Sequence, residues 1–541
     1  MHDAPAVEPP NHGRHPHSHF IIRTGLPSFF EAALAIASAL LLVLAFPNFD
    51  IWWLGWIGLA PLMFAVARTG KALTAFFLGM LWGTIFFYGT CWWLTYPMIH
   101  YGNVPAWLAY PLLLLPVVFV SVFPGIACAA LSRTILRFGS AAIFAAPLMW
   151  VAFDWLRYVI TGLGWNAIGY SQAFHAQLIQ PARCGGVYAV TFLMVMTSTA
   201  IIFAFLRRTP LGVVAAIIVL ILVAAIIASG SLKTTSEANE SKPPENFVIA
   251  VQPNVPMEGV DDVETKALLE RHLDLSLQGL GSIPPDNSTA RLVIWPESPM
   301  SFSYSRDPKL QDVVGSFARA HHASVLLNSL EPAPNNGGYN SAILVNEEGR
   351  IAAQYDKIRL MPFGEYVPLP RWLPGSGSVR SIVGEFTPGS SYTLMPLGAF
   401  RVGVFICVEA VHPSIARSFT NAGADVLINI SNDGYLGPTP VMRQHLANAI
   451  FRAVENRRDV VRVTNTGISA YITKDGTLKD ATRGFQPTAR TWAVSKSSGS
   501  TFYSRHGDVF AYACALISLG IISATFTTRR RGTHASGLMH A

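Results

Sequence analysis

Three residues with complementary chemistry each stand at the end of a short apolar run that is typical of a strand. They are Glu297 in "RLVIWPES", Lys357 in "RIAAQYDK" and Cys407 in "RVGVFIC". A thiol is only a few per cent ionised at neutral pH, so it needs a base or a nearby cation before it can act as a nucleophile. Glu297 could take the proton, while Lys357 could favour the thiolate and then hold the oxyanion of a tetrahedral intermediate. The three residue types together predict acyl transfer through a thioester.

These residues are far apart in the sequence, and only the fold can bring them together. In α/β domains, sites form at the carboxyl ends of strands, where all three stand. Taken singly, each has a commoner structural role, since a buried cysteine usually behaves as a small hydrophobe. A pairing of Cys407 with His412 or His445 is an alternative, but His445 falls inside a predicted helix, where we expect an ordinary structural hydrogen bond. A metal site is disfavoured because neither a second cysteine nor a close histidine pair stands near Cys407.

Residues 246–505 contain the elements that would position the three side chains. Short runs of branched residues bounded by turn formers predict strands, and runs with a helical period predict helices between them. Such alternation indicates one α/β domain. The predicted strands are 247–255, 291–295, 324–330, 339–346, 350–357, 401–407, 425–431 and 460–465, and the predicted helices are 261–278, 308–322 and 439–458.

The rest of the chain has the composition of a membrane protein. Of its 541 residues, 51% are hydrophobic and only 13% are charged. Apolar stretches long enough to cross a hydrocarbon core of about 30 Å begin near residues 29, 51, 72, 105, 140, 186, 211 and 508. The sequence therefore predicts a disordered tail 1–28, seven spans within 29–230, a linker 231–245, the α/β domain 246–505, an eighth span 506–528 and a basic tail 529–541.

Positive charge is distributed unevenly between the short segments that join these spans. With the N-terminus inside, the inner segments hold most of the Lys and Arg, and the outer loops hold only Arg157 and Arg183. Both termini are therefore expected in the cytoplasm and residues 246–505 on the opposite side. The net charge of +7 reflects this bias and does not indicate nucleic-acid binding. Cys407 is the only cysteine of the α/β domain, and an unpaired thiol in an oxidising compartment favours a chemical role.

A long Pro- and Gly-rich segment, 361–391, interrupts the alternation of strands and helices. Loops of this length in compact domains are usually functional lids or disordered, and the aromatic content here argues against disorder. Its aromatic residues include Phe363, Tyr366 and Trp372. Either this loop dips into the membrane interface, or it covers the core of its own domain.

Four strings carry a resemblance to a known family: "WPES", "YDKIRLMPFGEYVP", "CVE" and "NISNDGYLG". They resemble the nitrilase superfamily, and specifically the membrane-embedded bacterial apolipoprotein N-acyltransferases. The resemblance implies an α/β nitrilase-like sandwich (α-β-β-α) inserted before the last helix of an eight-helix transmembrane bundle. It also implies a multi-pass protein of the bacterial inner membrane with its catalytic domain in the periplasm.

The activity implied by the resemblance moves a fatty acyl chain from a phospholipid, usually phosphatidylethanolamine, to the N-terminal amine of a diacylglyceryl-cysteine apolipoprotein. No metal or cofactor is implied. In this ping-pong reaction Glu297 would be the general base, Lys357 the oxyanion stabiliser and Cys407 the nucleophile. The motifs further point to Glu365 and Glu409 as supporting carboxylates, and to Phe363, Tyr366, Trp372, Asn432 and Tyr435 as substrate or lid residues.

The chain departs from the family pattern around the implied pocket, and other functions stay open. Val408 stands where the family commonly has Tyr, and Leu436 where it commonly has Phe. These changes leave room for a related acyltransferase with another acceptor. A second hypothesis is a membrane-tethered amidase or nitrilase that uses the same three residues and releases its product to water. A third is a transporter with an accessory domain, for which the few candidate charges are Glu31, Asp154 and Arg157.

Overall fold

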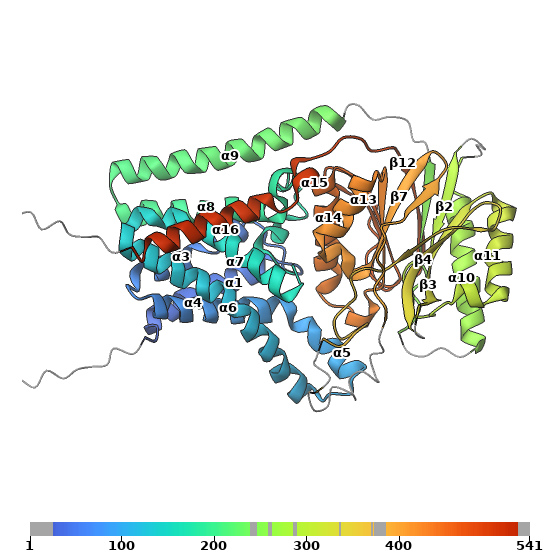
Figure 1. Ribbon diagram of the computed structural model, residues 1–541, viewed down its shortest axis with the longest axis horizontal. Coiled ribbons are helices and arrows are strands. Elements are labelled where there is room, and N and C mark those ends of the chain that lie inside the picture. The colour runs from blue at the N-terminus through green and yellow to red at the C-terminus, as the bar shows by residue number, and fades with distance from the viewer. Residues whose placement is uncertain are drawn as a thin grey trace, which may run out of the picture.

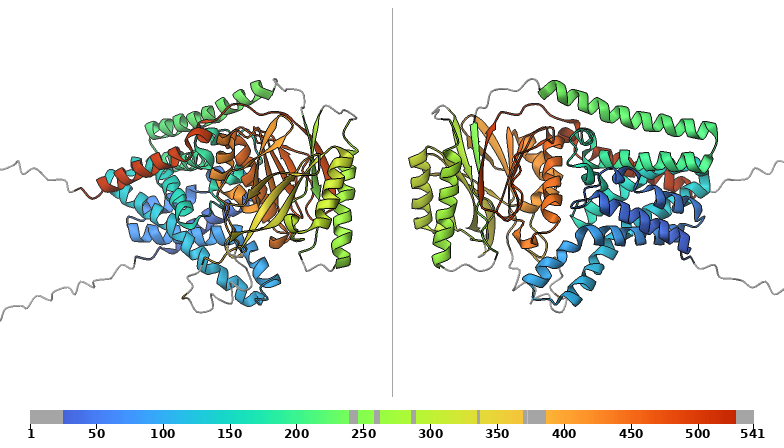
Figure 2. Two further views of the ribbon diagram at one scale, coloured as in Figure 1. Left: turned by 45° about the vertical axis from the view of Figure 1, so that its right-hand side comes forward. Right: turned by 180° about the vertical axis from the view of Figure 1, so that it is seen from behind.

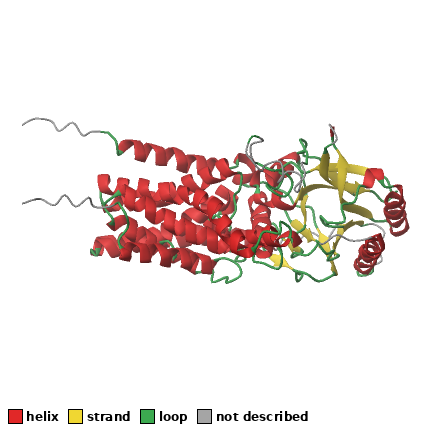
Figure 3. Cartoon of the chain, turned by 90° about the horizontal axis from the view of Figure 1, so that it is seen from below, coloured by secondary structure: helices red, strands yellow, loops and turns green. Residues whose placement is uncertain are grey.

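The computed structural model describes residues 25–238, 246–257, 262–284, 289–334, 337–368, 372 and 386–527. The chain forms two adjoining parts, one made of helices and one made of sheets covered by helices, as Figures 1 and 3 show. We call them the helical region, residues 25–238 with 502–527, and the sandwich, the described residues from 246 to 501. Views from opposite sides give the same division (Figure 2).

The helical region is built from apolar helices that run roughly side by side. Among the described residues, five helical segments are long and apolar enough to cross a membrane, namely 72–100, 106–138, 140–161, 182–207 and 210–230. Shorter apolar helices cover 29–45, 54–68 and 509–524. All the predicted apolar spans thus form helices, while the count of eight membrane crossings stays a prediction. The elements are α1 (Phe29–Ala45), α2 (Leu54–Ile57), α3 (Ala60–Arg68), α4 (Ala72–Cys91), η1 (Trp92–Leu94), α5 (Thr95–His100), α6 (Ala106–Phe138), η2 (Ser140–Ala145), α7 (Ala146–Thr161), η3 (Ile168–Gln172), α8 (Ala182–Arg207), α9 (Pro210–Ala238), α15 (Phe502–His506) and α16 (Val509–Ala524).

The boundary after the seventh predicted span differs from the prediction. Helix α9 continues to Ala238, well into the segment 231–245 that the sequence indicates as a linker. The run "SLKTTSEA" contains no Gly or Pro, so nothing in it breaks a helix that has already formed.

Helices α4 and α6 pack closely because of a small residue at their crossing. A Cβ atom on Gly79 would overlap the carbonyl oxygen of Pro124 on the facing helix. A glycine therefore lets the two backbones approach, as in other membrane helix pairs. This contact fixes two of the helices that line the cavity described below.

The sandwich contains two mixed sheets that pack face to face. Among the described residues, the strand order is β12-β1-β2-β3-β4-β5 in one sheet and β11-β10-β9-β8-β7-β6 in the other. Strands β1, β2 and β3 are parallel, as are β7, β8 and β9. The strands are β1 (Asn246–Gln252), β2 (Ala290–Ile294), β3 (Ser324–Pro332), β4 (Gly338–Val345), β5 (Ile351–Asp356), β6 (Leu394–Leu397), β7 (Phe400–Ile406), β8 (Val426–Ser431), β9 (Val460–Thr464), β10 (Ala470–Ile472), β11 (Leu478–Lys479) and β12 (Thr488–Val494).

Helices cover both outer faces, which gives the predicted α-β-β-α layers. In β1, Val248 and Ala250 join the core between the sheets, whereas Ile249 and Val251 face outward toward the covering helices. Helices α10 (Asp262–Leu280) and α11 (Pro308–His321) cover the first sheet, and α13 (Pro413–Ala422) and α14 (Val441–Asn456) cover the second. Every predicted strand and helix of this domain is present. The sequence reading missed α13, β6 and the strands β10 to β12.

Helix α14 lies between the second sheet and the helical region, where it packs against α8 and η3 (Figure 1). A buried hydrogen bond crosses this junction, next to an ion pair within α14. Arg452 donates to Glu455 at 2.8 Å and to the hydroxyl of Tyr170 in η3 at 3.2 Å. All three side chains are buried, so this contact holds the sandwich and the helical region together away from solvent.

Candidate active site

The strand ends bring the three predicted residues together. Strands β2 and β5 run in the same direction within one sheet, so their carboxyl ends share an edge. Glu297 follows β2 by three residues, Lys357 directly follows β5, and Cys407 directly follows β7 of the facing sheet. Lys357 Nζ lies 3.4 Å from Glu297 Oε1. Both charges act on the Cys407 thiol.

Lys357 is held between two carboxylates. Its ammonium lies 2.9 Å from Glu365 Oε1, and Asn340 in β4 donates to Glu297 at 2.9 Å and to Glu365 at 2.7 Å. Burial by itself lowers the pKa of Lys357, but Glu297 and Glu365 more than offset this and raise it above its usual value. The lysine is therefore a permanent cation. Asn340 was missed by the sequence analysis because a single asparagine within a strand carries no signal.

The backbone at Cys407 adopts a conformation that non-glycine residues rarely take. Its φ is +51°, and the chain passes there from β7 directly into the short helix η6 (Cys407–Val411). A left-handed residue with a side chain costs about 1–3 kcal/mol and persists only where its surroundings hold it. Here Glu409 accepts a hydrogen bond from the Ile406 amide at 2.7 Å, and His445 Nε2 donates to the Cys407 carbonyl at 2.9 Å.

Glu409 connects the nucleophile's turn to the segment that carries Lys357. Its Oε1 accepts from the Tyr355 hydroxyl at 2.8 Å and from the amides of Ile358 and Arg359 at 2.8 and 3.0 Å. The side chain is fully buried, and burial raises the pKa of Glu409 while its hydrogen-bond donors oppose the rise. This geometry makes Glu409 a positioning residue.

The electrostatic surroundings keep the Cys407 thiol protonated at rest. Burial raises its pKa most, and the Glu297 carboxylate raises it further, while Lys357 opposes. A thiol in this state needs a base at the moment of attack. His445 does not fill that role, because its ring nitrogens contact the Cys407 carbonyl and, at 2.9 Å, the Asp433 carboxylate. The expected structural hydrogen bond of His445 is confirmed.

Asp433 supports the turn at Cys407 through its contact with His445. Burial raises the pKa of Asp433, but Arg462 and His445 more than offset this and lower it to about 2. Arg462 donates to Asp433 Oδ2 at 2.8 Å, and both side chains are buried. Arg462 is a second residue that the sequence analysis missed, since its place in strand β9 gives no local sign of its partner.

A cavity extends from Cys407 into the helical region. At the sandwich end its wall includes Cys407, Val408, Asn432 and His445. Most of the remaining wall is apolar and comes from the helical region: Phe87, Trp93, Leu94, Leu113, Pro116, Val117, Val120, Leu163 and Trp165. An apolar chamber that ends at a thiol suits a hydrocarbon chain whose reactive carbon lies at one end.

The charges singled out as possible transport residues have local partners. Arg157, in the cavity wall, lies 2.7 Å from Asp154 and also donates to the Leu163 carbonyl at 3.1 Å. Glu31 accepts from the Ser28 amide at 2.8 Å and so caps the start of α1.

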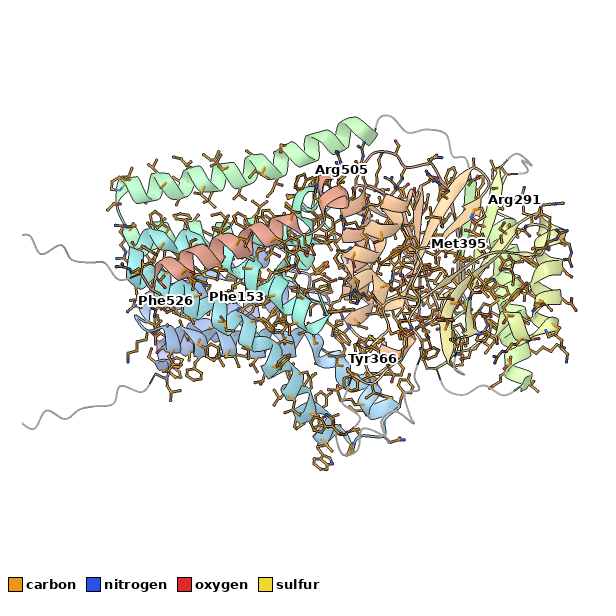
Figure 4. The ribbon with its side chains drawn as sticks, in the orientation of Figure 1. Phe153, Arg291, Tyr366, Met395, Arg505 and Phe526 are labelled. Carbon is orange, nitrogen blue, oxygen red and sulfur yellow. The ribbon has the colours of Figure 1, made fainter. Side chains whose placement is uncertain are left out.

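The predicted substrate and lid residues divide between the cavity and the surface. Asn432 and Tyr435 line the cavity, and Tyr435 stacks on Tyr101 with ring centres 4.9 Å apart. Tyr366 is half-buried at the junction of the two parts, as Figure 4 shows. Phe363 is 50% and Trp372 81% exposed, so neither covers the domain core. The rest of this loop, 369–371 and 373–385, lies outside the described residues.

An α-β-β-α sandwich with a carboxylate, a lysine and a cysteine at its strand ends defines the carbon–nitrogen hydrolase class, and residues 250–525 match that family's model. Residues 38–200 match the apolipoprotein N-acyltransferase N-terminal domain. The chain is 31% identical to the apolipoprotein N-acyltransferase of Geobacter metallireducens, over 93% of this chain and 96% of the relative. It is 30% identical to that of Allorhizobium ampelinum, over 83% and 86% of the two chains. An amidase from Nesterenkonia sp. AN1 covers 50% of this chain and 97% of its own, with 16% identity and a TM-score of 0.37. The chain belongs to the apolipoprotein N-acyltransferase family, which confirms the resemblance drawn from its motifs.

Proposed function

We propose that this protein moves a fatty acyl chain from a membrane phospholipid to the N-terminal amine of a diacylglyceryl-cysteine lipoprotein, through a thioester on Cys407. The observation that supports this most directly is the apolar cavity between the helices and Cys407. Both substrates are anchored in lipid, and a cavity walled by apolar helices gives a hydrocarbon chain a continuous environment up to the sulfur atom.

In the first half-reaction, Glu297 takes the proton of the Cys407 thiol as sulfur attacks the ester carbonyl carbon of the donor. The carbonyl oxygen becomes an oxyanion, which the ammonium of Lys357 stabilises. When the intermediate collapses, the carbon–oxygen bond to glycerol breaks, and the glycerol oxygen takes the proton back from Glu297. A lysophospholipid leaves, and the acyl chain stays on sulfur.

In the second half-reaction, the α-amino group of the acceptor attacks the thioester carbon. Glu297 accepts the proton that the amine loses, and Lys357 again stabilises the oxyanion. Collapse breaks the carbon–sulfur bond, and Glu297 returns the proton to sulfur. The products are an amide and the free thiol, so one carboxylate serves both halves of a ping-pong cycle.

We also propose the setting of this reaction. The charge bias of the short loops supports an inner-membrane protein with eight spans, cytoplasmic termini and a periplasmic sandwich. Phosphatidylethanolamine is the proposed donor. The proposed division into segments 29–230, 246–505 and 506–528 rests on the apolar stretches of the sequence, with the linker shortened by the extension of α9.

The test is to supply purified protein with phosphatidylethanolamine and a diacylglyceryl peptide, and to follow both by mass spectrometry. We expect an acyl adduct on Cys407, then an N-acylated peptide, and neither product from Cys407→Ala. An unchanged adduct on Cys407→Ala contradicts the thioester. Free fatty acid in place of N-acylated peptide would identify a hydrolase and contradict the proposed acceptor.

A further inference from the structure

A second cavity lies beside the first at the junction of the helical region and the sandwich. The two cavities share Thr161 and Leu163 in their walls. Tyr366, which also lines the second cavity, marks its place at the junction in Figure 4. A ligand that occupies the first cavity could therefore extend around this shared wall into the second.

Among the described residues that line the second cavity, Arg359 is the only one that carries a charge, because the histidine there is neutral. That histidine is His412, and burial together with Arg359 lowers its pKa to about 3. The Arg359 side chain is exposed and has no carboxylate partner among the described residues. Arg157 in the first cavity differs, because Asp154 already neutralises it. The second cavity thus presents an uncompensated guanidinium.

The backbone of Arg359 lies next to the reaction centre. Arg359 follows Lys357 by two residues, and its amide donates to the same Glu409 carboxylate that binds the Ile406 amide. One buried carboxylate therefore separates Arg359 from the turn that carries the nucleophile. In a glycerophospholipid, only the glycerol backbone separates the ester from the phosphate, so a donor whose ester lies at Cys407 carries its phosphate only a few bonds away.

The charge balance at the centre calls for a cation at this position. Glu297 and Glu365 bring two negative charges, and Lys357 brings one positive charge. An anionic phosphate that approaches this surplus is repelled unless another cation faces it. Arginine binds phosphate through paired, charge-assisted hydrogen bonds.

We propose that Arg359 binds the phosphodiester group of the acyl donor in the second cavity, so that the donor's ester carbon lies at Cys407. This inference rests on the proposed function. Arg359 then holds the donor during attack and the lysophospholipid as it leaves. It has no part in the second half-reaction, because the acceptor amine carries no phosphate.

The test compares two donors in detergent micelles: dipalmitoyl phosphatidylethanolamine and dipalmitoylglycerol, which has the same esters but no phosphate. The rate of acyl-Cys407 formation is measured by intact-protein mass spectrometry for wild type, Arg359→Gln and Arg359→Lys. Arg350→Gln is the matched control, since this exposed arginine stands at the opposite end of β5.

We expect Arg359→Gln to lower kcat/KM for the phospholipid about 10- to 100-fold, the range of a lost charged hydrogen bond. Arg359→Lys should lose less, and dipalmitoylglycerol should react equally with all variants. An equal loss with both donors, or a loss only in transfer from acyl-Cys407 to the peptide, overturns the inference. Wild-type protein that forms no acyl-Cys407 with either donor refutes the proposed function itself.

Discussion

Replacing Glu297 by Gln should change two reactions of Cys407 in opposite directions. The glutamine oxygen can still accept from Asn340 and Lys357, which lie 2.9 and 3.4 Å from Oε1. Its NH₂ group then faces the Asn432 amide, which donates to Oε2 at 3.1 Å in the wild type. One lost hydrogen bond at a partly exposed side chain costs about 1–3 kcal/mol, so the variant should fold. Without the base, acyl-enzyme formation should fall about 10²- to 10⁴-fold.

Alkylation of the same thiol should become faster. After burial, the Glu297 carboxylate is the largest cause of the raised pKa of Cys407, and Lys357 opposes it. Removing one like charge within about 4–6 Å moves a pKa by about one to three pH units. At a fixed pH below that pKa, the thiolate fraction and the alkylation rate by iodoacetamide should therefore rise at least about tenfold.

The assay measures both rates on the same preparation across pH 6 to 9, with Glu348→Gln as the control. Glu348 is exposed in the turn between β4 and β5, so its substitution removes an equal charge far from the site. A parallel fall of both rates would mean that Glu297 only shapes the site. An acyl-enzyme rate that equals the wild type would refute its role as base.

The remaining predictions concern the cavity wall and the buried ion pair between Asp433 and Arg462. Val117→Trp should fill part of the apolar cavity and slow acylation by long-chain phospholipid about tenfold or more. With a dihexanoyl donor, the same variant should keep the wild-type rate. The control is Val118→Trp, whose native side chain is 42% exposed, and it should keep the wild-type rate with both donors. Equal slowing of both donors would contradict this role. Asp433→Asn should lower stability by about 3–5 kcal/mol, because it leaves Arg462 buried without a carboxylate. The pKa of Asp433 falls from 3.8 to about 2 on folding, so about 2 kcal/mol of stability is present above about pH 4 and is lost as the pH falls toward 2. In thermal unfolding in detergent, the difference in stability between wild type and Asp433→Asn should narrow below pH 4. A difference that stays constant with pH, or that also appears for the exposed Asp312→Asn, would contradict the coupling between this pKa and stability.

The meeting of the three proposed catalytic residues could be predicted because the signals that place them are local. Glu297, Lys357 and Cys407 each follow a strand that its own branched residues specify, and strand ends of like direction meet at one edge of a sheet. The sequence signal for α14 was equally local, since Leu446, Ile450 and Val454 recur at four-residue intervals and all three are buried. The α/β class and the site edge follow from such patterns, whereas the α-β-β-α layers were expected from the family resemblance alone.

Contacts between distant polar side chains could not be predicted in this way. Asn340 bridges two carboxylates from β4, and Arg462 reaches Asp433 from β9, yet neither residue differs in type or spacing from a solvated strand residue. The short strands β6 and β10 were missed because they contain only a few residues, too few for a two-residue period to show. Pairing with longer neighbours stabilises them, which is tertiary information.

The protonated thiol and the apolar cavity are two consequences of one placement. Helix α14 packs the sandwich against the helical region, so the turn at Cys407 opens toward apolar helices rather than toward water. A permanent thiolate at the mouth of such a cavity would be desolvated without full compensation. The charges are instead kept on Glu297, Glu365 and Lys357, where Asn340 and backbone amides satisfy them. In the proposed mechanism, the sulfur becomes charged only as the proton moves to Glu297, beside the lysine that stabilises the next anion. A neutral nucleophile beside a fixed ion cluster is therefore the arrangement that an enzyme acting on lipid esters at an apolar wall requires.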